Sequence, residues 1–188
     1  HHYAWTTIPA SANRDPIDDL DDNVRSSVAL LEALRRRGGG RLVFASSGGT
    51  VYGRLRTIPV PEHHPTEPVT AYGVSKLAVE RYCGFYRHLH GLDCRVARIS
   101  NPFGAGQDPY RGQGAATTFL HRALAGEPIV IWGDGTVVRD YLHVSDAARG
   151  VAALSLADAD TLGDRWIFNI GSGTGTSLNA IVACLQSR

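Results

Sequence analysis

The chain has 188 residues, enough for about one domain, and a composition of 43% hydrophobic and 20% charged residues excludes a disordered or fibrous protein. Nineteen basic residues nearly balance 18 acidic ones, so charge gives no reason to expect a nucleic acid or a membrane surface as partner. The three cysteines follow no metal-binding spacing, and no apolar run approaches the ~18 residues of a transmembrane helix. We therefore expect a cytoplasmic protein without a disulfide framework.

Helical and strand-like segments alternate along the chain. Helices are indicated by apolar residues at helical spacing, and strands by short apolar runs between glycines and serines. This alternation is typical of an α/β fold with a Rossmann-like, doubly wound and mainly parallel sheet. The expected helices cover residues 16–37, 72–90 (ended by Gly91), 115–125, 145–156 (capped by Ser145) and the segment after Ser177, and the expected strands cover 42–45, 94–99, 129–131 and 166–170.

The first chemistry-bearing pattern is the pair Tyr72 and Lys76 at the start of a predicted helix. Residues four apart share one helix face, so the two side chains can meet. A phenol is a weak base near neutral pH because its pKa is ~10, but a neighbouring ammonium and the helix N-terminus both lower that value. Such a pair can remove a hydroxyl proton while hydride leaves the same carbon. The spacing alone also fits a surface lysine beside a half-buried tyrosine.

Hydroxyl side chains follow the strand expected over residues 42–45. Ser46, Ser47 and Thr50 lie at its C-terminal end, and this edge of an open parallel sheet is where ligands bind. A hydroxyl there could hydrogen-bond the reacting oxygen together with Tyr72. The same residues also fit a serine–glycine turn that only reverses the chain.

Six ordered segments resemble the extended short-chain dehydrogenase/reductases, above all their nucleotide-sugar epimerase/dehydratase branch. Residues 43–53 (Val-Phe-Ala-Ser-Ser-Gly-Gly-Thr-Val-Tyr-Gly) and 72–76 (Tyr-Gly-Val-Ser-Lys) carry the resemblance most clearly. A further segment, His-Tyr-Ala at 2–4, is similar to the one that follows the family's fourth strand. The other matches are Asp-Asn-Val at 22–24, Arg-Ile-Ser-Asn-Pro-Phe-Gly at 98–104, Trp-Gly-Asp-Gly at 132–135 followed by Val-Arg-Asp-Tyr-Leu-His-Val at 138–144, and Phe-Asn-Ile-Gly at 168–171.

The resemblance implies a role for each matching residue. Tyr72 would be the catalytic acid/base, and Lys76 would bind the nicotinamide ribose of NAD and tune Tyr72. Ser47 is the first choice for the hydroxyl partner and Thr50 the second, because Gly48 stands where many relatives carry that hydroxyl. The implied contacts to NAD are Tyr3, Ala4, Asn23, Ser46, Tyr72, Lys76 and Pro102, and those to a nucleotide-sugar substrate are Asn101, Gln113 and Arg139.

The chemistry of Arg139 supports its assignment independently, because a guanidinium fork matches phosphate oxygens. The alternative is a surface arginine paired with its neighbour Asp140. The histidines at 63–64, 88 and 90 have no cysteine or glutamate partner at ligand spacing, so no metal site is expected.

The loop over residues 46–53 favours one reaction within the family. Dehydratases of this branch place Asp-Glu directly after the catalytic threonine, because elimination of water needs an extra acid and base. This loop has Gly48, Gly49 and Thr50 and no carboxylate. The resemblance therefore implies an NAD-dependent 4-epimerase of UDP-hexoses that acts through a transient 4-keto sugar. The alternatives are a nucleotide-sugar reductase or dehydratase, and a non-catalytic fragment of such an enzyme.

The family's glycine-rich dinucleotide motif has no counterpart in the chain. Family members begin with a strand, Gly-x-x-Gly-x-x-Gly and a helix, whereas the glycines over 171–175 are differently spaced and lie near the other end. We expect both ends to be cut relative to family members. Residues 1–104 would then be the C-terminal part of the NAD-binding domain, and 105–188 an incomplete substrate-binding part that includes a returning Rossmann strand. The family's common dimers imply a homodimer through the helices at 16–37 and 72–90.

Overall fold

The computed structural model describes residues 1–187, which form two compact units. Unit 1 comprises His1–Ile99 and Arg149–Ile170, and unit 2 comprises Ser100–Ala148 with the residues from Gly171 onward. In the part of the chain that is described, no helix combines the length and the apolar character needed to span a membrane.

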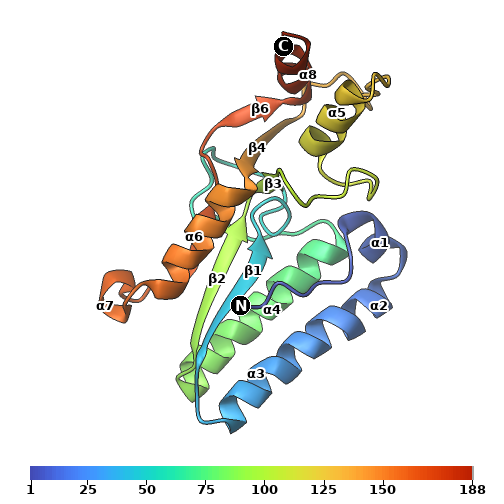
Figure 1. Cartoon of the computed structure of the whole chain (residues 1–188). Coiled ribbons are helices and arrows are strands. Elements are labelled where there is room, and N and C mark those ends of the chain that lie inside the picture. The colour runs from blue at the N-terminus through green and yellow to red at the C-terminus, as the bar shows by residue number, and fades with distance from the viewer. Residues whose placement is uncertain (188) are drawn as a thin grey trace. The chain divides into compact units, whose positions relative to one another are not determined.

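Unit 1 is built on a parallel sheet with the strand order β1-β2-β5. Strands β1 (Arg41–Ser47) and β2 (Asp93–Ile99) run side by side over their full lengths (Figure 1), and β5 (Ile167–Ile170) pairs with the second half of β2. On the outer side of β1, His2 makes a parallel bridge to Phe44. The predicted α/β fold with a parallel sheet is confirmed.

The helices of unit 1 agree with the main predictions and add short elements. The helix expected over 16–37 is one continuous helical run whose middle turn is π-helical. The short helices α1 and α7 were not predicted. The bounds are α1 (Pro9–Arg14), α2 (Pro16–Asp19), η1 (Leu20–Arg25), α3 (Ser26–Arg36), α4 (Ala71–His90), α6 (Val144–Leu156, in unit 1 from Arg149 on) and α7 (Ala159–Leu162).

Both faces of the unit 1 sheet are covered by apolar side chains, as is usual for parallel sheets. Successive strand residues point to opposite faces, so neighbours in β1 join different clusters. Phe44 packs with Leu31 of α3 and Val79 of α4, whereas Val43 packs with Val151 of α6. Each such side chain, once buried, contributes about 1.5–3 kcal/mol to folding. The contact between Phe44 and Val79 fixes the position of α4 over one face of the sheet.

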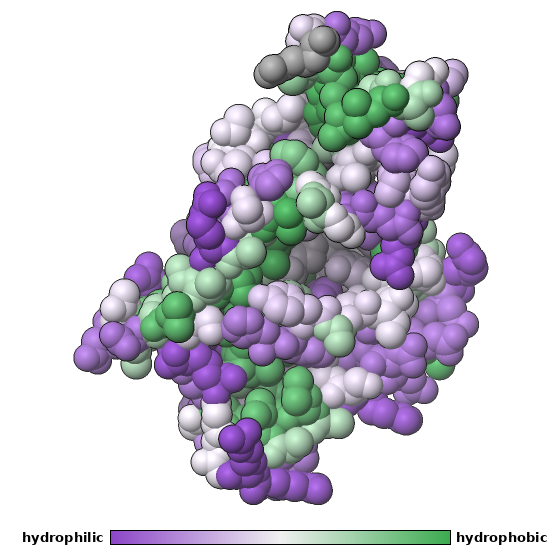
Figure 2. Space-filling view, in the orientation of Figure 1, coloured by the Kyte–Doolittle hydropathy of each residue, from purple (hydrophilic) through white to green (hydrophobic). Residues whose placement is uncertain are grey.

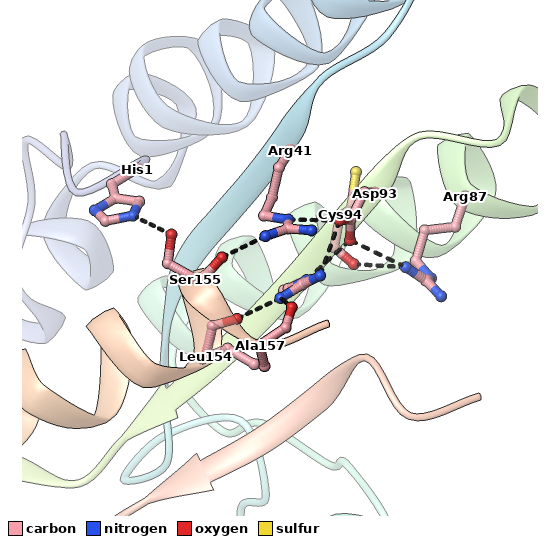
Figure 3. A network of polar contacts seen from close by, with 9 residues as sticks. His1, Arg41, Arg87, Asp93, Cys94, Leu154, Ser155 and Ala157 are labelled. Carbon is pink, nitrogen blue, oxygen red and sulfur yellow. Dashed lines mark hydrogen bonds and ion pairs between the residues drawn. The ribbon is translucent and has the colours of Figure 1, made fainter. Parts of the chain in front are cut away.

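A polar network fastens the first residues of β1 and β2 to the end of α6 (Figure 3). The guanidinium of Arg95, only 1% exposed, donates to the carbonyls of Leu154 (2.5 Å) and Ala157 (2.7 Å). Asp93 accepts from both Arg95 (2.9 Å) and Arg41 (2.6 Å). These bonds satisfy a buried cation that would otherwise be costly, and they lie at the opposite end of the strands from Ser46 and Ser47.

Unit 2 contains a small mixed sheet, two complete helices and the first residues of α6. Strand β4 (Val138–His143) pairs in parallel with β3 (Asn101–Phe103) and antiparallel with β6 (Gly175–Ser177). Its helices are α5 (Ala115–Leu124) and α8 (Leu178–Gln186). Figure 2 shows hydrophobic residues gathered over these two helices.

Two predictions about unit 2 need correction, one strand was missed, and one prediction is confirmed. Residues 129–131 form no strand, and the strand of this region is β4, which was not predicted. Ser145 lies inside α6 rather than capping it, because the helix already begins at Val144. Ser177 caps α8 as expected, since its hydroxyl accepts from the amide of Ala180 (3.1 Å).

Candidate active site

The helix α4 presents Tyr72 and Lys76 in its first turns, at the C-terminal end of β1. Its start is fixed by Thr70, whose hydroxyl accepts from the amide of Gly73 (3.1 Å), and its end by Gly91, whose φ of 63° suits glycine. Lys76 is 4% exposed, and its ammonium donates to the carbonyl of Ala45 in β1 (2.8 Å). The structure therefore joins the predicted pair directly to the strand that precedes the hydroxyl-rich loop.

Aromatic rings surround the ammonium of Lys76. Its Nζ lies 3.7 Å from the ring centroid of Trp5, 5.0 Å from that of Phe44 and 5.5 Å from that of Tyr72. Trp5 also meets Tyr72 edge-on, with 5.9 Å between the ring centroids. Trp5 directly follows the family segment at residues 2–4, and no sequence pattern indicated a role for it.

The pKa values of the pair differ from the sequence-based expectation. Burial and then the charge of Asp19 raise the pKa of Tyr72 to about 12 instead of lowering it. Burial lowers the pKa of Lys76 to about 7, against the opposing charges of Asp19 and Glu80. Desolvation is the largest cause of both shifts, and the lysine amine is directed to a backbone carbonyl.

The three hydroxyls after β1 have different surroundings. Ser46 is buried and donates to the carboxylate of Glu80 (2.5 Å), so this hydroxyl is engaged within the protein. Ser47 is partly buried, and its backbone carbonyl accepts from the amide of Val51 (3.3 Å). The hydroxyl of Thr50 is buried and has no hydrogen-bond partner. An unpaired buried hydroxyl is costly, which makes Thr50 a stronger candidate than the sequence suggested.

Gly73 brings the loop that carries Thr50 against α4. A Cβ atom at this glycine would lie 2.7 Å from the carbonyl oxygen of Thr50 and 3.0 Å from the Cβ of Pro68. Only glycine permits this approach, so the residue beside Tyr72 sets the distance between the helix and the hydroxyl-bearing loop.

Three buried polar residues of the α2–α3 helical run hold the N-terminal segment, and we call Asp19, Asn23 and Ser27 the polar stripe. Asn23 accepts from the amide of Thr6 (2.9 Å) and donates to Asp19 (3.0 Å). Thr7 donates to Asp19, and His2 is hydrogen-bonded to Ser27 (2.7 Å). The amide of Asn23, expected at the cofactor, is thus engaged in positioning the segment over residues 2–7, in which Tyr3 and Ala4 are exposed.

In unit 2, a cavity of about 230 Å³ gathers three of the predicted residues, Asn101, Pro102 and Arg139. Aliphatic and aromatic side chains, among them Phe103 and Leu178, complete its lining. Gln113 is exposed and lies outside this lining. The cavity therefore combines a guanidinium and an amide with largely apolar walls, as is usual for small-molecule sites.

The alternative partner of Arg139 is engaged elsewhere. The carboxylate of Asp140 accepts from the amides of Ser172 (2.9 Å) and Gly173 (2.9 Å), while Arg139 donates to the carbonyl of Val138 (2.9 Å). Asn101 donates to the backbone carbonyl of Asp140 (3.1 Å). These bonds order both sides of the cavity and leave most of the Arg139 guanidinium for a ligand.

Residues 1–171 match the family model described as the NAD dependent epimerase/dehydratase family. The chain is 36% identical to a protein named putative UDP-glucose 4-epimerase from Methanocaldococcus jannaschii, over 96% of this chain and 57% of that protein. It is 34% identical to the dTDP-4-dehydro-6-deoxyglucose reductase of Escherichia coli, over 98% of this chain and 57% of that protein.

A similar solved structure is that of the UDP-glucose 4-epimerase from Thermotoga maritima with UDP-glucose. It superimposes with a TM-score of 0.92 at 36% identity, and the match covers 99% of this chain and 59% of that one. The chain thus spans a little more than half the length of these relatives. On the family match and this agreement in fold, the chain belongs to the NAD-dependent epimerase/dehydratase family.

Proposed function

We propose that the protein is an NAD-dependent 4-epimerase of nucleotide sugars, with UDP-hexoses such as UDP-glucose and UDP-galactose as substrates. The observation that carries the proposal is the Tyr72–Lys76 pair beside a loop with no carboxylate. Within this loop Gly48 is tightly packed, since a Cβ there would lie 3.2 Å from the carbonyl oxygen of Arg98. Because elimination needs an additional acid and base, this loop favours oxidation and reduction at one carbon.

The residues of unit 1 fit the nicotinamide ribose end of NAD. Lys76 offers an ammonium and Ser47 a hydroxyl at the C-terminal end of a parallel strand, the usual position for such a ligand. Tyr3, Ala4, Asn23 and Ser46, all in unit 1, would contribute to this region. We accordingly propose that residues 1–104 are the C-terminal part of the NAD-binding domain, and that 105–188 form an incomplete substrate-binding part with a returning Rossmann strand. Asn101 would add a substrate contact from the first of these segments.

In the proposed reaction Tyr72 accepts the proton of the sugar C4 hydroxyl and later returns it. When held beside Lys76 and Ser47, NAD would supply reversible hydride transfer at the sugar C4, on either face of the 4-keto sugar. Thr50 or Ser47 would hold the reacting oxygen by a hydrogen bond. The ammonium of Lys76 would favour the phenolate that Tyr72 needs as a base, against the burial that now raises its pKa.

The cavity of unit 2 would receive the nucleotide part of the substrate. Arg139 and Asn101 would bind the diphosphate, for which a guanidinium provides parallel hydrogen bonds. Gln113 would act as an additional contact to the nucleotide. This assignment rests on the lining of the cavity and on the family's substrates.

We also propose that the protein forms a homodimer through the helices at 16–37 and 72–90. Val74, Phe85 and Leu89 of α4 are 54%, 47% and 61% exposed, and Ile17 of α2 is 69% exposed. Such apolar side chains on two neighbouring helices are suited to packing against a second copy.

A cytoplasmic location also stays a prediction, consistent with the free cysteines at 83, 94 and 184.

A nucleotide-sugar reductase is the second candidate, favoured by the similarity to the Escherichia coli reductase. An epimerase regenerates its cofactor, whereas a reductase consumes NADH or NADPH in proportion to product. Net absorbance change at 340 nm during turnover therefore separates the two activities.

The proposal is tested first by calorimetric titration of the chain with NAD, followed by conversion of UDP-galactose to UDP-glucose. Binding and epimerisation without net NADH formation would support it. If the folded chain binds no NAD, the same assays should be repeated with the longest protein that its gene encodes. Absence of epimerisation by that protein would contradict the proposal.

A further inference from the structure

The environment of Lys76 is unusual in two respects. It is the only lysine in the sequence, in which 18 of the 19 basic residues are arginine. It is also almost fully buried, with the indole of Trp5 covering its ammonium at 3.7 Å. An ammonium can be stabilised by the electron-rich face of an indole, and this attraction strengthens when water is excluded.

We propose that Trp5 is a positioning residue for Lys76, whose indole face holds the ammonium beside Tyr72 and favours its charged form. The inference rests on the proposed function in one respect, namely that Lys76 serves the cofactor and Tyr72. Trp5 is suited to this role because its own ring is fixed. Its Nε1 donates to the hydroxyl of Thr7 (3.1 Å), and Thr7 in turn donates to Asp19 of the polar stripe.

The other groups that act on Lys76 come from four segments. Asp19 of α2 and Glu80 of α4 favour the ammonium, whereas His2 of the N-terminal segment disfavours it, and Tyr72 contributes a neutral ring. Burial opposes the charge most strongly and lowers the pKa of Lys76 to about 7. The carbonyl of Ala45 satisfies one ammonium proton. The Trp5 face is the aromatic surface nearest to the ammonium, and it offsets part of the cost of burial.

The lone lysine makes this contact directly measurable. After incorporation of lysine labelled with ¹³C at Cε, the chain gives one lysine side-chain signal, which is followed against pH by NMR without cofactor or substrate. Protons beside an indole face are shifted upfield, so we expect an upfield signal that titrates near pH 7. In Trp5→Leu the upfield shift should disappear.

Fluorinated tryptophans separate the electrostatic effect from packing. Ring fluorination weakens the electron-rich face with little change in size, so the pKa of Lys76 should fall in steps from tryptophan to mono-, di- and tetrafluorotryptophan, by about 0.5–1 unit in total. The matched control is the same series in Trp5→Phe, where Trp132 and Trp166 alone carry fluorine and the pKa should not move.

Two outcomes would overturn the proposal. One is a Lys76 pKa that stays constant across the fluorinated series, and the other is a signal without an upfield shift in the unmodified chain. Because these measurements use the chain alone, they stand even if NAD binding or epimerisation is not found. If the activity is found, its pH profile should shift with fluorination in parallel with the NMR pKa.

Discussion

Glu80 of α4 and Arg98 of β2 form an ion pair in which neither side chain is more than 3% exposed. Arg98 binds both carboxylate oxygens, at 2.6 Å from Nη2 and 3.0 Å from Nε, and Ser46 donates to the same carboxylate. Because Glu80 lies one turn after Lys76, this pair attaches the helix that carries Tyr72 to the sheet. It also explains why the Ser46 hydroxyl is not free.

Removal of one partner of this pair should destabilise the protein strongly. In Arg98→Met the carboxylate of Glu80 remains buried without its cation, which we expect to cost about 3–5 kcal/mol in the free energy of unfolding measured with urea. The exposed pair of Arg56 and Glu67 provides the control, since Arg56→Ala should cost no more than about 1 kcal/mol. Equal losses in the two variants would contradict this account.

Substitution of Gly73 should disturb both stability and the site. The added Cβ of Gly73→Ala meets the backbone of Thr50, which cannot move without shifting the loop, so we expect a loss of about 1–3 kcal/mol. Gly84→Ala on the same helix is the matched control. Its Cβ would meet only the side chain of Trp166, at 3.1 Å, and the gain in helix propensity of about 1 kcal/mol should offset that contact.

Tyr72→Phe should abolish proton transfer while preserving the fold. We expect the rate of UDP-galactose epimerisation to fall by about 10²–10⁴-fold, with an unchanged circular dichroism spectrum. Tyr82→Phe removes a hydroxyl from a partly exposed tyrosine of the same helix and should leave the rate within about twofold. Retention of the wild-type rate in Tyr72→Phe would exclude the assigned role.

Lys76→Met should stabilise the chain in a pH-dependent manner. The pKa of Lys76 is about 7 in the folded chain and 10.5 for an unperturbed lysine, so between these pH values the unfolded chain binds more protons and stability rises with pH. The buried ammonium lowers the free energy of unfolding most below pH 7. Above pH 10.5 this penalty vanishes, because the lysine is then neutral in both the folded and the unfolded chain. The variant should therefore be more stable than the wild type at pH 6, by about 2–5 kcal/mol, and the difference should shrink by pH 10. A pH-independent difference in urea unfolding would contradict the assignment.

Local signals made much of unit 1 predictable. Gly91 after a long periodic segment fixed the end of α4, and short apolar runs located β1 and β2, because a strand buried on both faces needs apolar residues at nearly every position. The strand expected over 129–131 failed for a related reason. Val130 is 56% exposed, so an apolar run was mistaken for a buried one.

Other features depend on contacts between residues far apart in sequence. Strand β4 carries Arg139, Asp140 and His143 among its six residues, so it has no continuous apolar run, and its pairing with β3 and β6 defines it. The predicted fall in the pKa of Tyr72 assumed a lysine directed at the phenol, whereas Lys76 is directed at Ala45 and is covered by Trp5. The fact that Lys76 is the only lysine was visible in the sequence and was the available signal for its special environment.

The polar stripe has a consequence for the precision of the N-terminal segment. Apolar contacts tolerate small displacements, but hydrogen bonds are directional and short. His2, Thr6 and Thr7 each bond to a different member of the stripe. If the segment slid by one residue along the helical run, all of these bonds would be lost together, and buried polar groups would remain unpaired. The stripe therefore permits only one register of the N-terminal segment along the helical run. This register places the indole of Trp5 over the ammonium of Lys76.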